Sequence, residues 1–237
     1  MRWPQVAKSV GILACNLCIA TQLLSAQQHT AHDIVASVAE ALGGADRIDA
    51  LRTFRFEVHH WRDGSEWFTG VWEIQRPNLI RKEYSSTVIF DGIRASIDSG
   101  SPGGPELVDA DEWFHFPFDI ACVFPAFFDH DSEYLGQHTV EGVDGHLLRV
   151  KLPLGGAVTY FIDAEYHLPR RLAITLDVGD TESEMTLSWG LEDFREVDGV
   201  LFPHAYSYDG NHVRALQTVE FNVPFPDDHF KVAIGND

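Results

Sequence analysis

The sequence predicts a mainly β protein with some α: one antiparallel sheet of about ten strands, curled so that helices cover its apolar face. Three observations support this fold class. From Thr53 onward, apolar residues recur at every second position over most of the chain. Asp-Gly pairs, which favour tight hairpins, separate many of these segments. Helical patterns are confined to residues 30–51 and to an aromatic stretch at 112–128, so these two regions must cover the sheet.

The first helix is predicted to begin at Thr30, in "TAHDIVASVAEALGG". Thr30 and Asp33 have the spacing of a capping box, which satisfies backbone N–H groups at a helix start. Apolar residues from Ile34 to Leu42 fall on one helical stripe. The glycine pair at 43–44 supplies the stop. The following "ADRIDAL" predicts a second, short helix.

The first strands place their apolar residues on one face of the sheet. This face carries Phe54, Phe56 and Val58 of "TFRFEVHHW" and, after the "DGS" turn, Phe68, Trp72 and Ile74. Arg55 and Glu57 face the other way. "LIRKEYSS" and "TVIFDGIRASID" continue the sheet, the latter with a hairpin signal at Asp91–Gly92, and "SGSPGGPE" is predicted to be a loop.

Strands are expected to resume near Glu133 and to run almost to the end of the chain. Further turns are predicted at the Asp-Gly pairs 144–145, 198–199 and 209–210. In "EMTLSWGLE" the apolar positions are Met185, Leu187, Trp189 and Leu191. No linker or internal repeat interrupts the chain, which predicts a single domain over residues 27–237.

The stretch "EWFHFPFDIACVFPAFF", residues 112–128, holds seven aromatic residues in seventeen positions of an acidic chain. Pro117 and Pro125 exclude one long straight helix. The run is also too short and too interrupted to span a membrane. We expect two short helical pieces, or one helix and an irregular segment, packed against the apolar face of the sheet.

Residues 1–26 have the pattern of an export signal. Arg2 and Lys8 form a basic start, "VGILACNLCIATQLL" an apolar run, and "LSA" before Gln27 a cleavage site. We therefore expect a periplasmic protein from which this segment is removed. Two alternatives stay open: retention as a membrane anchor, for which the apolar run is short, and lipid anchoring through Cys15 or Cys18.

Composition excludes several classes of function. The net charge of −19 repels phosphate backbones, so we expect no nucleic-acid partner. After residue 26 only Cys122 remains, which excludes an internal disulfide and a cysteine-pair metal site. The adjacent His59 and His60 point to opposite faces of a strand and cannot chelate together. We find no HExxH or GxSxG motif, and expect no metal, no cofactor and no catalysis.

Three segments resemble the LolA-like group, periplasmic relatives of the lipoprotein carriers LolA and LolB. They are "EALGGADRIDALRTFRFE" near the start, "TYFIDAEYHLPRRL" at 159–172 and "DFREVDGVLFPH" at 193–204. The resemblance extends with gaps over roughly residues 31–230. It implies a single unclosed antiparallel β-barrel with helices packed in its mouth and an apolar cavity that holds lipid or lipoprotein acyl chains.

The predicted cavity has two walls. Its floor, on the concave face of the sheet, comprises Phe54, Phe56, Phe68, Trp72, Met185, Leu187 and Trp189. Its cover comes from the aromatic stretch and comprises Trp113, Phe114, Phe118, Phe127 and Phe128. We expect a monomeric, non-enzymatic carrier of acyl chains.

Three alternatives remain open. The same aromatic residues can simply fill a core, as any sheet interior requires. The chain can instead be a sensor or interaction domain whose rim binds an inner- or outer-membrane protein. A hydrolase is the weakest alternative, because the many acidic residues nominate no particular catalytic pair.

Overall fold

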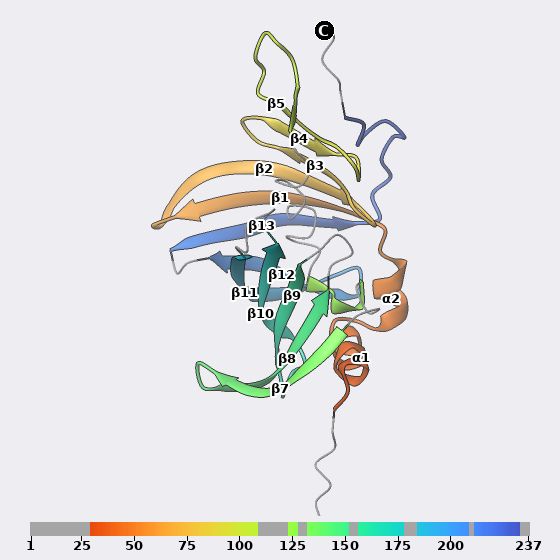
Figure 1. Ribbon diagram of the computed structural model, residues 1–237, viewed down its shortest axis with the longest axis vertical. Coiled ribbons are helices and arrows are strands. Elements are labelled where there is room, and N and C mark those ends of the chain that lie inside the picture. Colours follow the sequence, from red (N-terminus) through yellow and green to blue (C-terminus); the bar gives the residue numbers. More distant parts are fainter. Residues whose placement is uncertain are drawn as a thin grey trace, which may run out of the picture.

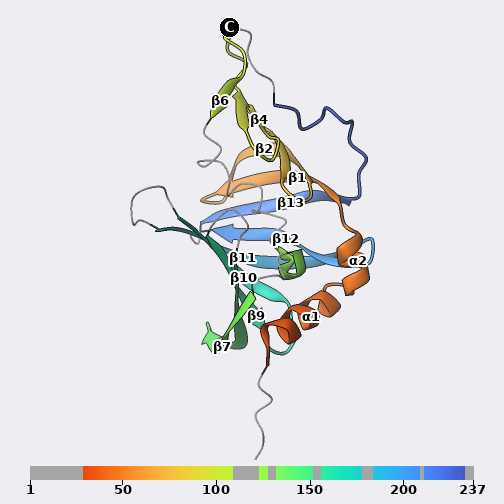
Figure 2. The same cartoon turned by 45° about the vertical axis from the view of Figure 1, so that its right-hand side comes forward.

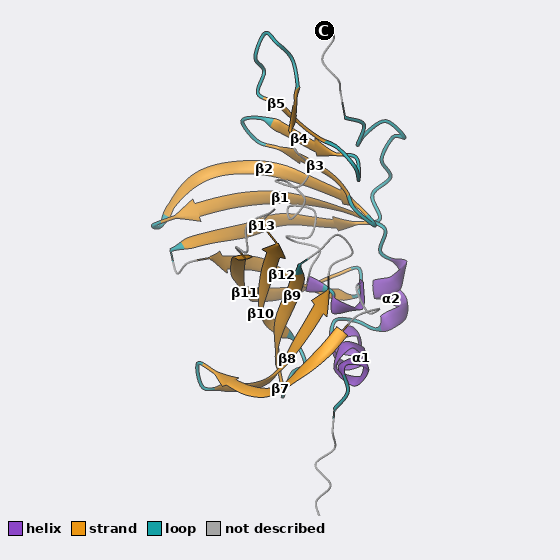
Figure 3. Cartoon of the chain, viewed as in Figure 1, coloured by secondary structure: helices purple, strands orange, loops and turns teal. Residues whose placement is uncertain are grey.

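The computed structural model describes residues 29–108, 123–127, 132–151, 156–177, 184–208 and 211–232 (Figure 1). The described residues form one strongly curved antiparallel sheet with two helices beside it (Figure 3). The mainly β prediction is therefore confirmed, as is the unclosed sheet. The predicted signal segment, residues 1–26, lies outside the described residues.

The described part of the chain contributes thirteen strands to the sheet, in the order β6-β5-β4-β3-β2-β1-β13-β12-β11-β10-β9-β8-β7. Their bounds are β1 Thr53–Arg62, β2 Ser65–Gln75, β3 Leu79–Glu83, β4 Thr87–Phe90, β5 Ala95–Asp98, β6 Glu106–Val108, β7 Ser132–Val140, β8 Val143–Lys151, β9 Ala157–Asp163, β10 Pro169–Asp177, β11 Glu184–Val197, β12 Val200–Tyr208 and β13 His212–Phe221. The predicted count of about ten was too low, because strands such as β6 are too short to show an alternating pattern.

The strand order has a consequence for the chain between β6 and β7. The two meanders β1–β6 and β7–β13 join where β1 pairs with β13, which puts β6 at one edge of the sheet and β7 at the other. Residues 109–131 connect these two strands. The aromatic stretch therefore belongs to the segment that links the two edge strands of the open sheet.

Helices α1 (Ala31–Ala41) and α2 (Ala45–Ala50) lie at one end of the strands (Figures 1 and 2). The capping box is confirmed: Thr30 Oγ1 accepts from the Asp33 backbone N–H, and the Thr30 N–H donates to Asp33. The helices dock where Leu201 N–H donates to the Leu42 carbonyl at 2.8 Å. Within the described ranges, neither helix has the length and apolarity that crossing a membrane requires.

Four of the five predicted Asp-Gly turns fall on described residues, and the pair at 63–64 forms the turn between β1 and β2, as expected. Asp91–Gly92 and Asp198–Gly199 lie in hairpin turns, as expected. The turn predicted at Asp144–Gly145 was wrong: both residues lie within β8, and the turn is at Glu141–Gly142. A Cβ at Gly145 would come within 2.6 Å of the Phe161 ring, so this glycine serves strand packing instead. The pair at 209–210 lies outside the described residues.

The core lies on the concave face of the sheet. In β1, Phe54, Phe56 and Val58 are fully buried while Arg55 and Glu57 are exposed, which confirms the predicted alternation. Cross-strand register continues this face onto β2, where Phe56 pairs with Trp72 and Phe54 pairs with Ile74. The apolar residues of α1 and α2 pack into the same cluster.

Candidate functional site

The floor of the candidate site is a group of phenylalanine rings at the centre of the concave face. Phe54 and Phe56 come from β1, Phe202 from β12 and Phe221 from β13. The rings of Phe56 and Phe202 stack at 5.5 Å between centroids, and Phe221 meets Phe54 edge-on at 5.6 Å. Phe202 and Phe221 were not predicted to belong to the site, because only the strand order places β13 beside β1 and β12 beside β13.

Residues 123–127, the described part of the aromatic stretch, lie on this floor; we call them the insert. Val123 and Phe124 are fully buried. The Phe124 ring lies 5.7 Å from that of Phe202, and the Phe127 ring 6.2 Å from that of Phe54. The predicted packing of the stretch inside the sheet is confirmed for these five residues, and Phe124 joins the site although the sequence did not single it out.

Arg76 fastens the insert to the sheet. Its guanidinium carbon lies 3.8 Å from the centre of the Phe127 ring, a cation–π contact, and its Nη1 donates to the Leu51 carbonyl at 3.1 Å. Burial lowers the pKa of Arg76, and the nearby charge of Arg52 lowers it further. The side chain nevertheless stays charged near neutral pH, because an arginine begins from a very high pKa.

The predicted site residues divide into three groups. Phe54, Phe56, Trp72 and Trp189 are buried on the concave face, and Phe68, Phe127 and Leu187 are half-buried on or against it. Met185 pairs with Leu176 in the β10–β11 ladder, but its side chain is outside the description. Trp113, Phe114, Phe118 and Phe128 lie outside the described residues. That these residues line a ligand cavity stays a prediction.

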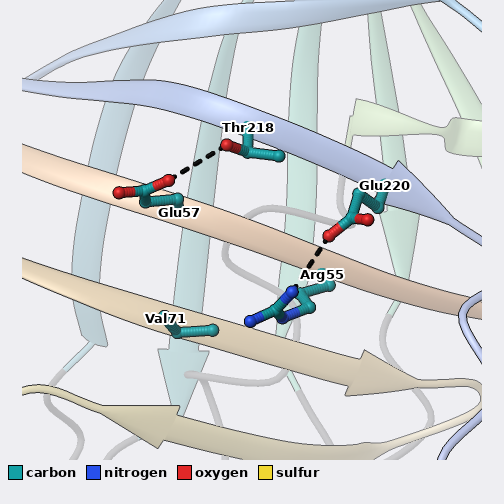
Figure 4. Close-up of a pocket in the computed structure, with 5 residues that line it drawn as sticks. All are labelled: Arg55, Glu57, Val71, Thr218 and Glu220. Atoms are coloured by element: carbon teal, nitrogen blue, oxygen red, sulfur yellow. Dashed lines mark hydrogen bonds and ion pairs between the residues drawn. The ribbon is translucent and has the colours of Figure 1, made fainter.

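The opposite, convex face carries a small polar pocket of about 250 Å³ (Figure 4). Arg55, Glu57, Val71, Thr218 and Glu220 line it. Arg55 pairs with Glu220 at 3.2 Å, and Thr218 donates to Glu57 at 3.0 Å. Because these polar groups satisfy one another and only Val71 is apolar, this pocket does not suit an acyl chain.

No family model matches the chain, and no curated protein matches it by sequence. Solved structures do match. A LolA superfamily protein from Nitrosomonas europaea is 12% identical, with 86% of this chain and 98% of that chain covered and a TM-score of 0.56. A DUF1329 family protein from Desulfovibrio piger is 10% identical, with 85% and 97% covered and a TM-score of 0.56.

A third match is a domain from Vibrio parahaemolyticus described as outer membrane lipoprotein-sorting. It is 6% identical, with 85% of this chain and 97% of that chain covered and a TM-score of 0.52. Identities this low establish the fold alone. The chain has the LolA-like fold, and the resemblance read from the three sequence segments is confirmed at that level.

Proposed function

We propose that the protein is a non-enzymatic periplasmic carrier that holds lipid or lipoprotein acyl chains against the concave face of its sheet. The fold supports this, since two of the three solved structures compared above are described as LolA superfamily or lipoprotein-sorting proteins. The floor supports it as well, because its rings form a continuous apolar surface.

The observation that carries the proposal is the position of the insert. The floor is covered at its centre by residues 123–127, and not by a second sheet. These residues belong to the connection between the two edge strands and make no described ladder with the sheet. Moving the insert therefore exposes the floor without breaking inter-strand hydrogen bonds, and an acyl chain can take its place.

The energy of such an exchange is adequate. Burying an alkyl chain yields roughly 0.8 kcal/mol per methylene. The ligand must replace the contacts of Phe124 and Phe127 with the floor, and it must also offset the ordering and association costs of binding. A chain of about sixteen carbons has enough gross driving force for this.

The periplasmic location rests on residues 1–26 and is tested by intact mass. A secreted protein that lacks these residues and carries no added mass supports a soluble carrier. A mass that includes Met1, or one increased by acyl groups at Cys15 or Cys18, refutes it.

The direct test of the carrier is lipid binding by the wild-type protein. Native mass spectrometry of gently purified protein should show bound lipid, and 11-(dansylamino)undecanoic acid should bind with an increase in fluorescence. Phe124→Asp should strengthen this binding, because a carboxylate at this position cannot compete with the acyl chain for the apolar floor. Tyr166→Asp is the matched control, since Tyr166 is an exposed aromatic residue in the β9–β10 turn. A protein that is empty and binds no acyl probe refutes the proposal.

A second candidate is a sensor domain that binds a protein partner through its rim. Exposed aromatic side chains favour it: Trp61, Trp67 and Tyr84 lie at one end of β1–β3, and Trp67 is 57% exposed. Aromatic residues are enriched at protein interfaces. Co-purification of a single protein partner, lost in Trp67→Ser, would support the sensor, whereas bound lipid without a partner supports the carrier.

A further inference from the structure

A histidine is buried where α1 meets the sheet. His146 of β8 is only 3% exposed, and α1 lies against β7 and β8 (Figure 1). The Nδ1 of His146 lies 2.9 Å from the hydroxyl oxygen of Tyr134 in β7. Burial raises the pKa of Tyr134, so this hydroxyl stays protonated and can donate to a neutral His146.

A second histidine joins this one from the helix side. His29 immediately precedes Thr30, the residue that caps α1. The centre of its ring lies 5.0 Å from that of His146 and 6.5 Å from that of Tyr134. The start of α1 therefore rests on the sheet through a contact between two imidazoles. Two neutral imidazoles can pack in this way, whereas two imidazolium ions at this distance repel each other.

The docked helix makes His146 a poor site for a proton. Burial lowers the pKa of His146, and the nearby His29 and His167 lower it further. His29 approaches from the start of α1 and His167 from the turn between β9 and β10. When α1 moves away, water reaches the imidazole and its pKa returns toward about 6.5.

The carboxylates of the surrounding elements do not neutralise this pair. Among the described residues, the histidines that form ion pairs with carboxylates are His59 and His229. The neighbouring aspartates are engaged elsewhere: Asp33 of α1 with Thr30, Asp144 of β8 with Thr139, and Asp163 of β9 with Arg170. Other charged side chains and histidines on α1, β7 and β8 are exposed, among them His32, His138 and Arg149.

The helix is fastened differently at its two ends. At the C-terminal end, the Leu201 backbone N–H donates to the Leu42 carbonyl at 2.8 Å, a bond that does not titrate. At the N-terminal end, the contact with the sheet includes the His29–His146 pair. A fall in pH therefore acts on the N-terminal end of α1, and opening begins there.

We infer that α1 is a pH-sensitive latch, docked on β7 and β8 near neutral pH and opened when His146 and His29 take up protons. This goes beyond the proposed carrier function and does not depend on it. Because the opened state binds protons more readily than the docked state, acid favours opening. Opening begins as the pH falls through about 6.5 and levels off below the lower pKa of docked His146. Within that window, each pH unit raises the opened population up to about tenfold.

Opening of the latch exposes apolar surface. The buried side of α1 carries Ile34, Val35 and Val38, which belong to the same cluster as Phe54 and the other residues of the floor. The opened state therefore uncovers both this side of the helix and the part of the sheet beneath it. Protonation of histidines in mild acid is a general means of opening a packed contact of this kind.

The test is amide hydrogen exchange of the secreted protein at about pH 7.5 and about pH 5.5, with no lipid added and rates corrected for the intrinsic effect of pH. Protection of the α1 amides, residues 31–41, should fall severalfold, up to about tenfold, in the acidic sample. Protection of the β1–β13 ladder should change little. Titration of the histidine ring signals by NMR should give His146 a pKa below 6.5.

Three variants identify the groups responsible. His146→Gln cannot titrate, yet its amide can still bond the Tyr134 hydroxyl, so the pH dependence of α1 protection should disappear. His29→Gln should reduce it. His138→Gln is the matched control, because His138 lies on neighbouring β7 but is exposed, and it should keep the full response. If His146→Gln does not fold, His29→Gln and the wild-type NMR titration decide.

Several results would overturn the latch. One is α1 protection that does not change with pH, and another is a full response that survives in both His146→Gln and His29→Gln. An equal loss of protection in the β1–β13 ladder would show acid destabilisation of the whole protein. A His146 pKa at or above 6.5 would remove the driving force. None of these results bears on lipid binding, and failure of the carrier proposal would leave the latch unaffected.

Discussion

Truncation of Phe124 tests whether the insert is a movable cover or a fixed part of the core. The Phe124 ring is fully buried and, among the described residues, has three aromatic neighbours: Phe54 at 6.5 Å, Phe127 at 4.9 Å and Phe202 at 5.7 Å. Removing a buried phenylalanine ring costs about 3–5 kcal/mol in general. If the insert opens on its own, about 3 kcal/mol of this loss favours the opened state and raises its population about 100-fold.

The assay measures opening of the insert and entry of the ligand separately. In Phe124→Ala, hydrogen exchange of amides in 123–127 should accelerate, while exchange in the β1–β13 ladder changes little. Association of 11-(dansylamino)undecanoic acid, followed by stopped flow, should accelerate over the same range, because the ligand enters through the opened state. Tm should fall only slightly.

Phe56→Ala is the matched control for Phe124→Ala. Phe56 is equally buried and stacks on Phe202 and Phe54, but it belongs to the central strand β1. Its loss should appear in global unfolding, with a cost of about 4 kcal/mol and a Tm lowered by about 10 °C. If Phe124→Ala lowers Tm as much as Phe56→Ala and leaves probe association unchanged, the insert is fixed core and the reasoning fails.

Three further predictions concern the scaffold. Burial alone would raise the pKa of the Asp163 carboxyl, but hydrogen bonds and an ion pair outweigh it and lower the pKa. Asp163→Asn should therefore cost about 1–2 kcal/mol in urea unfolding at pH 7. The difference from wild type should vanish as the pH falls through the folded-state pKa, which lies below 3.8. Thr30→Ala should cost about 1 kcal/mol by removing the α1 cap. Gly43→Ala, whose new Cβ would lie 2.3 Å from the Gly199 carbonyl oxygen at a φ of +127°, should cost more than Gly64→Ala, where φ is also positive but no atom lies within 4 Å.

The sequence was sufficient to predict one wall of the site and its polarity. Phe54, Phe56 and Trp72 could be assigned to the concave face because a strand alternates sides at every residue, whatever its neighbours are. Lys82 could not be assigned to it. A lysine in "LIRKEYSS" is ordinarily exposed, and only its pairing with Trp72 shows that it faces inward.

The sequence also could not predict which distant strands lie next to each other. Phe202 and Phe221 alternate as Phe54 does, but alternation does not say which strands are adjacent. The turn predicted at Asp144–Gly145 was wrong because a glycine can serve two purposes. An Asp-Gly pair is a strong turn signal, but here the small size of Gly145 is needed where the strand packs against Phe161.

The edge-to-edge connection shows why the strand order matters for function. A segment that joins neighbouring strands is held by the ladder at both ends, whereas residues 109–131 join β6 and β7, the two edge strands, which do not pair with each other. The described insert is held on the floor by apolar contacts and by Arg76, not by strand pairing. Apolar contacts with a floor can be exchanged for those of an alkyl chain at little net cost, while ladder hydrogen bonds cannot. Arg76→Met should therefore loosen the insert, and accelerate probe association, without a comparable loss of global stability.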